Sequence, residues 1–187
     1  MSRLRQITDG DASDRARPLL DAVKHRLGLV PNMTRAMVNS PAALDGYLQF
    51  SGALARGTLP AKVREQISLA VAQANGCDYC LAAHTTVGKA IGLTPDQVRD
   101  ARLGGAVDTR TDALLKFARR VVETRGKVAD ADLAAVRAAG WDDGAVAEVV
   151  AHVALSLFTN YFNNVAGTDL DFPKAPALHA AAPVKAG

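Results

Sequence analysis

The fold of this chain is decided by residues 60–92, which read PAKVREQISLAVAQANGCDYCLAAHTTVGKAIG. In the first half, apolar side chains recur every three or four residues, the spacing of one buried helical face. These side chains belong to Val63, Ile67, Val71 and Ala74. Asn75-Gly76 breaks the pattern, and a second helical stretch then begins at about Cys77 and ends at Gly92. We therefore expect a helical hairpin over residues 60–92.

Helix signals recur along the rest of the chain, and strand signals do not. An N-cap residue followed by proline opens two of the predicted helices, at Ser40-Pro41 and at Thr94-Pro95. Outside the hairpin, the predicted helices cover about residues 19–27, 41–57, 94–104, 114–126, 130–140 and 143–166. We expect one all-α domain over residues 1–187, a compact helical bundle with its core at about residues 13–172. The first dozen residues and a flexible tail over residues 173–187 are expected to be poorly ordered.

The composition fits one soluble domain and argues against several other classes of protein. The 187 residues are 49% hydrophobic and 22% charged, which is enough apolar material for a core. The basic residues are scattered among acidic ones, without the concentrated stripe that binds nucleic acid. The most apolar stretch, residues 149–158, is too short to span a membrane, and the N-terminus lacks the apolar stretch of a secretory signal. We expect a cytoplasmic protein that binds neither nucleic acid nor membranes.

A weak internal repeat relates the hairpin to the last predicted helix. Laying residues 63–70 on residues 146–153 aligns two pairs of identical residues and two pairs of small apolar residues. On the same alignment, Asn160 and Asn163 occupy the places of the two cysteines. The match indicates either a degenerate duplication of a helical hairpin or a coincidence between alanine-rich helices.

Two thiols and an imidazole share one face of the second helix of the hairpin. Cys77, Cys80 and His84 are separated by three and four positions, so a helix stacks them along a single stripe. Glu65 interrupts the apolar face of the first helix, and the packing of the hairpin directs it at the same stripe. A cysteine in the first turn of a helix meets unpaired N–H groups and the positive end of the helix dipole, which favour the thiolate. On this argument alone Cys77 is the more acidic thiol.

These residue types suit reversible thiol oxidation. A thiolate attacks the O–O bond of a hydroperoxide and becomes a sulfenic acid, which a neighbouring thiol captures as a disulfide. A histidine paired with a glutamate supplies the proton that the departing oxygen needs. Two other interpretations compete: a metal half-site completed by His84 and Glu65, and a pair of small core cysteines without chemistry. His152, in an apolar stretch, is interpreted as a hydrogen-bonded core residue or as part of an oligomer interface.

The pattern of glutamate, eleven residues, Cys-x-x-Cys, three residues and histidine resembles the signature of the alkylhydroperoxidase D-like branch of the carboxymuconolactone decarboxylase superfamily. Glu65, Cys77, Cys80 and His84 match that signature position by position. The flanking stretches LGLVPNMTRAMVNSPAALDGYLQF, AHTTVGKAIGLT and FTNYFNN also resemble the peroxidase-related members of the group. The likeness covers about residues 25–172.

The resemblance implies an all-helical fold that assembles into trimers or hexamers and reduces hydroperoxides with no bound cofactor. It implies that Cys80 attacks the peroxide and Cys77 resolves it, whereas the helix-end argument favours Cys77 as the thiolate. Glu65 and His84 are implied to move protons, and a dithiol protein, lipoyl or thioredoxin-like, is implied as the reductant. The chain departs from the family pattern where Tyr79, a poor base at neutral pH, replaces a histidine.

We therefore expect a cofactor-free thiol peroxidase or disulfide reductase that acts on a hydroperoxide. A non-catalytic redox sensor or thiol-switched interaction module is one alternative, and a lactone decarboxylase-like enzyme is another. A homo-oligomer is expected on physical grounds as well. The last predicted helix carries Phe158, Tyr161 and Phe162 near its end, and a domain of this size covers such side chains poorly.

Overall fold

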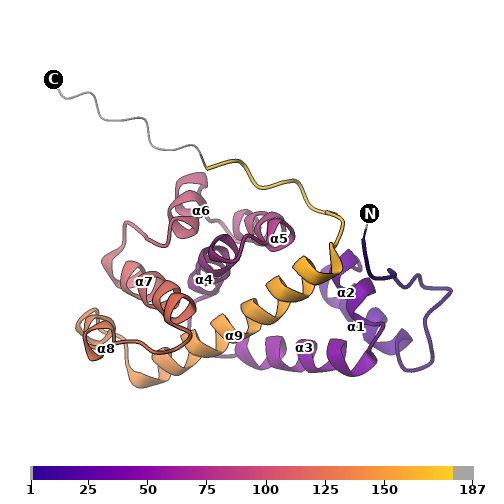
Figure 1. The fold of residues 1–187 in the computed structure, drawn as a ribbon, viewed down its shortest axis with the longest axis horizontal. Helices are drawn as coiled ribbons and strands as arrows, with labels where there is room; N and C mark the ends of the chain where they lie inside the picture. The colour runs from indigo at the N-terminus through magenta and orange to yellow at the C-terminus, as the bar shows by residue number, and fades with distance from the viewer. Residues whose placement is uncertain (1, 179–187) are drawn as a thin grey trace.

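The computed structural model describes residues 2–178, and over these residues the chain forms nine α-helices and no strand (Figure 1). In chain order the helices are α1 (Arg17–Leu27), α2 (Asn32–Met37), α3 (Pro41–Leu54), α4 (Ala61–Ala74), α5 (Asp78–Ala90), α6 (Pro95–Arg102), α7 (Thr109–Thr124), α8 (Asp130–Ala138) and α9 (Asp143–Ala166). The all-α prediction is confirmed, and the hairpin over residues 60–92 is formed by α4 and α5.

Short-range capping contacts fix where several helices begin. The Ser40 side chain accepts a hydrogen bond from the first turn of α3, and Thr94 and Gln97 form a reciprocal capping box at the start of α6. The cap of α8 comes from inside the helix. Asp130 lies inside the first turn of α8, and Asp132 instead accepts the N–H group that precedes the helix, at 2.8 Å.

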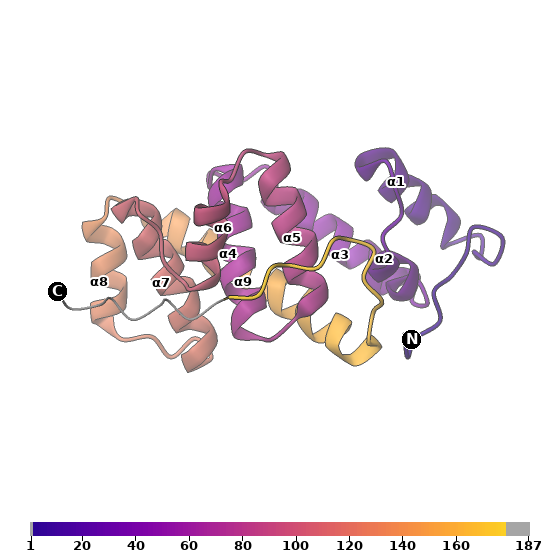
Figure 2. The ribbon, with the colours of Figure 1, turned by 90° about the horizontal axis from the view of Figure 1, so that it is seen from above.

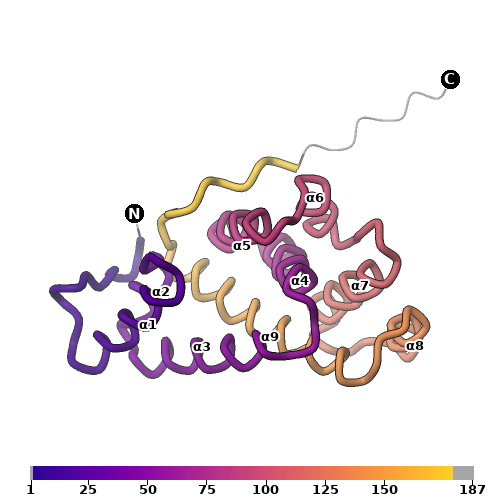
Figure 3. The backbone as a smooth tube through the Cα atoms, turned by 180° about the vertical axis from the view of Figure 1, so that it is seen from behind, coloured from indigo at the N-terminus to yellow at the C-terminus, as the bar shows by residue number. Residues whose placement is uncertain are grey.

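The central element of the molecule is α4, with the other helices arranged around it (Figures 1 and 2). It packs against α5, its partner in the hairpin, and against α6, α7 and α9. The long helix α9 crosses the molecule and contacts α7 near one end and α2 near the other, and Figure 3 shows α3 lying along it. The hairpin lies between α1 to α3 on one side and α7 and α8 on the other (Figure 2), and α6, α7 and α9 hold it in place.

One continuous hydrophobic core runs beneath the hairpin. Its largest fully buried side chains include Met37, Leu44, Leu59, Ile67, Leu69, Leu114 and Leu115. Both cysteines belong to this core. By length and composition α9 also qualifies as a membrane-spanning helix, but it packs on α3, α4, α5 and α7 as a core helix of the bundle.

The first residues are held more firmly than the sequence predicts. The N–H group of Arg3 donates to the carbonyl oxygen of Ala166 at 2.6 Å, and that of Ile7 donates to Arg35 at 3.0 Å. Ala12 is buried in the core. The expectation of a poorly ordered start is corrected, because backbone hydrogen bonds to distant helices hold this segment and leave no periodic pattern in the sequence.

Part of the expected flexible tail can be described. Residues 173–178 continue past α5 towards α6, as Figures 1 and 3 show, and Nη1 of Arg102 donates to the carbonyl oxygen of Pro176 at 2.6 Å. The rest of the tail, residues 179–187, lies outside the described residues.

The internal repeat does not produce a second hairpin. Residues 143–166 form one continuous helix, α9. At the positions that match the Asn75-Gly76 turn, α9 carries Phe158 and Thr159, and neither residue stops a helix. The stretch that matches α4 is therefore part of the long helix α9, which packs against α4 and does not repeat the α4–α5 hairpin.

Candidate active site

The hairpin brings Glu65 and His84 into contact. Gly76 at the turn has a φ of 59°, a left-handed conformation that glycine adopts without strain, and the chain there folds α5 back onto α4. Oε2 of Glu65 then lies 2.7 Å from Nδ1 of His84. The two side chains are 20% and 27% exposed, so the pair is mostly shielded from water.

The two cysteines meet at the start of α5. Cys77 is the N-cap residue, and its Sγ accepts a hydrogen bond from the backbone N–H group of Cys80 at 3.3 Å. The second sulfur, on Cys80, accepts a hydrogen bond from Nδ2 of Asn163 on α9, also at 3.3 Å. Both residues are free thiols and are 0% and 3% exposed.

These contacts give the two sulfurs opposite acidities. A hydrogen bond from the Cys77 thiol lowers the pKa of Cys80 to about 6, and the charge of His84 and the Asn163 amide act in the same direction, against burial. The same hydrogen bond, together with burial, raises the pKa of Cys77. The helix-end effect is present, because the N–H group of Cys80 acts to lower the pKa of Cys77, but the hydrogen bond with the Cys80 side chain and burial outweigh it. These environments favour the thiolate at Cys80 over the thiolate at Cys77.

His84 lies one helical turn after Cys80 on α5. Burial acts to lower the pKa of His84, but the Glu65 carboxylate and Cys80 act to raise it, and the net shift is upward. The imidazole therefore holds its proton more firmly than a free histidine does. Glu65 also fixes the ring, because its contact with Nδ1 leaves only Nε2 to face other groups.

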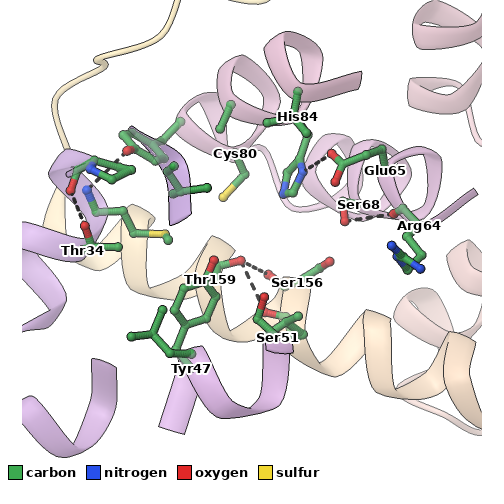
Figure 4. A pocket seen from close by; sticks show the side chains of 18 of the residues that line it. Thr34, Tyr47, Ser51, Arg64, Glu65, Ser68, Cys80, His84, Ser156 and Thr159 are labelled. Carbon is green, nitrogen blue, oxygen red and sulfur yellow. Dashed lines mark hydrogen bonds and ion pairs between the residues drawn. The ribbon is translucent and has the colours of Figure 1, made fainter. Parts of the chain in front are cut away.

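A cavity of about 310 Å³ opens over these residues, with walls from α1, α3, α4, α5 and α9 (Figure 4). Cys80, His84 and Glu65 line the cavity, and Cys77 is not one of the lining residues. A molecule in the cavity therefore meets the more acidic thiol, while the second thiol lies behind it in the core.

Tyr79, which stands in place of the histidine of the family pattern, has structural contacts. Its hydroxyl accepts a hydrogen bond from the N–H group of Met33 at 3.3 Å, and its ring meets that of Phe172 edge-on at 5.9 Å between centroids. Burial is the main cause that raises the pKa of Tyr79. The phenol keeps its proton at neutral pH and accepts none from the thiols.

Three polar residues of the site are absent from the sequence-based prediction. The sequence did draw attention to Asn163, because the internal repeat aligns Asn163 with Cys80. In the structure Asn163 contacts Cys80. Arg64 and His152 line the cavity, and their immediate sequence gave no sign of it. The prediction that His152 is a core residue is confirmed, because its side chain is 6% exposed. The predicted hydrogen bond is not found at Nε2, which has no partner within residues 2–178.

The metal-site interpretation is not supported by the geometry. Within the described part of the chain, no three His, Cys, Asp or Glu side chains are grouped so that they could hold a metal ion. Glu65 is already bonded to the ring of His84, and Cys77 lies in the core away from the cavity wall.

Comparison with known proteins places the hairpin in a described family. Residues 41–124 match the model of the carboxymuconolactone decarboxylase family. No curated protein matches the chain in sequence.

Solved structures resemble the chain over nearly its whole length. An alkylhydroperoxidase AhpD core protein from Ralstonia eutropha JMP134, an uncharacterized peroxidase-related protein, has a TM-score of 0.82 and 26% identity, covering 91% of this chain and 92% of its own. An uncharacterized peroxidase-related protein from Silicibacter sp. TM1040 has a TM-score of 0.79 and 20% identity, with 90% and 91% covered. A variant of the debrominase Bmp8 in complex with 2,3,4-tribromopyrrole has a TM-score of 0.77 and 17% identity, with 90% and 91% covered. The last two likenesses concern the fold alone.

Proposed function

Since the chain belongs to the superfamily of alkylhydroperoxidase D-like proteins and carboxymuconolactone decarboxylases, we propose that it is a thiol-dependent peroxidase that reduces organic hydroperoxides. Family and fold support an antioxidant or lactone-related role in general. The single observation that carries the finer assignment is the acidic thiol of Cys80 on the cavity wall, with the free thiol of Cys77 behind it, where its Sγ accepts a hydrogen bond from the backbone N–H of Cys80.

The first step of the proposed reaction uses Cys80 and His84. The Cys80 thiolate attacks the terminal oxygen of the hydroperoxide, an S–O bond forms and the O–O bond breaks. The departing alkoxide takes a proton from His84 and leaves as an alcohol, so the peroxide is reduced by two electrons and the sulfur becomes a sulfenic acid. Glu65 stabilises the protonated ring before transfer, and His84 regains a proton from water.

The second step closes the disulfide and the third reopens it. The Cys77 thiol attacks the sulfenic sulfur of Cys80, an S–S bond forms and water leaves. An external dithiol, lipoyl or thioredoxin-like, then exchanges with this disulfide, is itself oxidised to a disulfide, and returns both cysteines to thiols. The adjacency of the sulfurs at the start of α5 supports this order of events.

Hydroperoxide consumption by the purified protein tests the proposal. With cumene hydroperoxide and dihydrolipoamide, we expect many turnovers per chain and none with Cys80→Ser. Without the dithiol, we expect one equivalent of alcohol with Cys77→Ser, which stops at the sulfenic acid. A wild-type rate no higher than that of Cys80→Ser contradicts the proposal. One stoichiometric oxidation by the wild type supports a redox sensor instead, and lactone conversion that survives Cys80→Ser supports a decarboxylase-like enzyme.

We also propose that the chain forms a homo-oligomer through the outer face of α9. Phe158, Tyr161 and Val165 on this face are 42%, 57% and 65% exposed. Large side chains grouped on one helix face are typical of a subunit interface. Sedimentation of the purified chain as a monomer at micromolar concentration contradicts the proposal.

A further inference from the structure

One end of the cavity carries hydrogen-bond donors that have no acceptor. Figure 4 shows Arg64 beside Glu65 and Ser68 at this end, with Ser51 and Ser156 on the facing helices. One guanidinium nitrogen of Arg64, Nη1, donates to the carbonyl oxygen of Leu59 at 2.7 Å. Within residues 2–178 the guanidinium forms no ion pair, and its remaining N–H groups stay available.

Two carboxylates near Arg64 are already in use, and the second of them, Glu148, accepts hydrogen bonds from Thr58 and Leu59. Glu65, the neighbour of Arg64 on α4, is bonded to the ring of His84 at 2.7 Å. The positive charge of Arg64 is therefore not neutralised by that side chain, although Arg64 is only partly exposed. A half-buried cation with spare donors on a cavity wall is a site for an anionic oxygen group.

His152 lies at the same end of the cavity and also lacks a partner. Its side chain is 6% exposed, and its buried Nε2 has no hydrogen bond within the described residues. Burial and the charge of Arg64 both lower the pKa of His152, so the ring is neutral and carries one N–H donor. Buried polar atoms without partners are rare in folded proteins, and a ligand is one of the ordinary explanations.

The wall between this end and Cys80 is mostly apolar. Leu48, Ala83, Val87 and Leu155 are among the apolar residues that line the cavity as a whole. Cys80 and Arg64 are separated by the row formed by His84 and Glu65, so the reacting sulfur and the cation face different ends of one bound molecule. A cavity of about 310 Å³ is at the small end of the range for ligand sites, about 300–1,000 Å³.

We propose that Arg64, assisted by His152, binds a carboxylate of the substrate, so that the hydroperoxides reduced at Cys80 are those of small apolar carboxylic acids. The assignment of a hydroperoxide rests on the proposed function, whereas the carboxylate subsite rests on the cavity alone. A carboxylate accepts two parallel hydrogen bonds from a guanidinium, a pairing that a neutral ester or alcohol does not form.

Calorimetric titration with octanoate and with 1-octanol tests the subsite without any redox chemistry. Because a hydrogen bond to a charged group contributes about 1.5–3 kcal/mol, we expect octanoate to bind at least about tenfold more tightly than 1-octanol. Arg64→Gln is expected to remove this difference, and Arg64→Lys to retain part of it. Arg119→Gln is the matched control, because Arg119 also donates to a loop carbonyl, at 2.6 Å, but lies on α7 outside the cavity lining.

Turnover of a hydroperoxide of octanoic acid and of its methyl ester provides the second measurement. We expect the wild type to have a KM for the acid about tenfold below that for the ester, and Arg64→Gln to raise the KM for the acid towards that of the ester. His152→Leu is expected to shift the ratio in the same direction by a smaller factor. Arg119→Gln is expected to keep the wild-type ratio.

The two measurements separate this inference from the proposed function. Equal binding of octanoate and 1-octanol, or equal KM values for acid and ester in the wild type, overturns the carboxylate subsite even where peroxide is turned over. Tight octanoate binding that depends on Arg64, in a protein that reduces no hydroperoxide, supports the subsite and contradicts the peroxidase. The wild-type comparisons decide the matter even if the Arg64→Gln chain fails to fold.

Discussion

The Nδ2 atom of Asn163 donates a hydrogen bond to Sγ of Cys80 at 3.3 Å, across the contact between α9 and α5. The same amide donates its second hydrogen to the carbonyl oxygen of Thr159 at 2.9 Å, which fixes its orientation. A buried sulfur that accepts an amide hydrogen bond is stabilised as a thiolate. Asn163 thus links the last helix of the bundle to the acidity of the hairpin cysteine.

Replacing Asn163 by leucine is expected to raise the pKa of Cys80. The substitution removes a donor to a charged sulfur, a contact of about 1.5–3 kcal/mol, which corresponds to a rise of about one pKa unit or more. The rate of Cys80 alkylation by iodoacetamide, followed against pH, measures the shift. Asn164→Leu is the matched control on the same helix, because Asn164 donates to the carbonyl oxygen of Asn75 and not to sulfur. Identical profiles for the two variants contradict the role of Asn163.

The pH dependence of the wild-type thiols follows from their environments. With its pKa lowered to about 6, Cys80 is expected to lose alkylation rate as the pH falls through about 6, whereas an ordinary thiol does so near 8.5. The pKa of Cys77 is raised, so Cys77 stays unmodified across this range. Peptide mapping after alkylation distinguishes the two residues. A midpoint near 8.5 for Cys80 in the folded chain, equal to that of the denatured chain, contradicts the activation described here.

The sequence was a good guide to the helices because their ends carry local signals. Proline, N-cap residues and terminal glycines marked most of the predicted helices, and the apolar stripe marked the last one. The helix α2 (Asn32–Met37) was missed because six residues show no helical period. The pairing of Glu65 with His84 also followed from spacing. The spacing did not predict which of the two thiols has the lower pKa. That order depends on Asn163 of α9 and on the position of Cys77 just before α5. Tertiary contacts of this kind have no local pattern.

Glu65→Gln is expected to destabilise the fold most at low pH. The pKa of folded His84 lies above its ordinary value, so the stability from this contact is fully present below about pH 6.5 and is lost as the pH rises through the folded value. We expect a loss of about 1.5–3 kcal/mol in the free energy of unfolding at pH 6 and a smaller loss at pH 9, measured by urea denaturation. Glu123→Gln, which breaks an exposed contact with Arg119, is the control and is expected to cost about 0–1 kcal/mol. An equal loss at both pH values contradicts the charged state of His84.

Glu148, the counterpart of Glu65 in the internal repeat, is expected to be structural. Its carboxylate accepts hydrogen bonds from the N–H groups of Thr58 and Leu59 and from the Thr58 hydroxyl, at 2.7–3.0 Å, and so holds the loop before α4. A Cβ atom added at Gly57 would clash with this carboxylate, so the loop backbone approaches Glu148 closely. Burial acts to raise the pKa of Glu148, but these hydrogen bonds act more strongly to lower it, and the net shift is downward. The stability that the hydrogen bonds provide is therefore lost as the pH falls through the pKa of the folded state.

Glu148→Leu therefore lowers the melting temperature without moving the alkylation midpoint of Cys80. The loss of several hydrogen bonds to a carboxylate is expected to cost about 2–4 kcal/mol at pH 7 and less near pH 4. Thermal unfolding followed by circular dichroism at the two pH values measures the difference. A Cys80 midpoint that moves together with the melting temperature contradicts the separation between the two glutamates.

Tyr79→Phe distinguishes a structural phenol from a proton carrier. The substitution keeps the edge-on contact with Phe172 but leaves the N–H group of Met33 without its acceptor, at a cost of about 1–3 kcal/mol in the free energy of unfolding. The pKa of Tyr79 is raised and its hydroxyl accepts a hydrogen bond from the backbone. We therefore expect peroxide turnover to stay within about twofold of the wild type, and the alkylation midpoint of Cys80 to stay within about a few tenths of a pH unit. A tenfold loss of turnover in Tyr79→Phe with stability intact shows instead that the hydroxyl carries protons for the thiols.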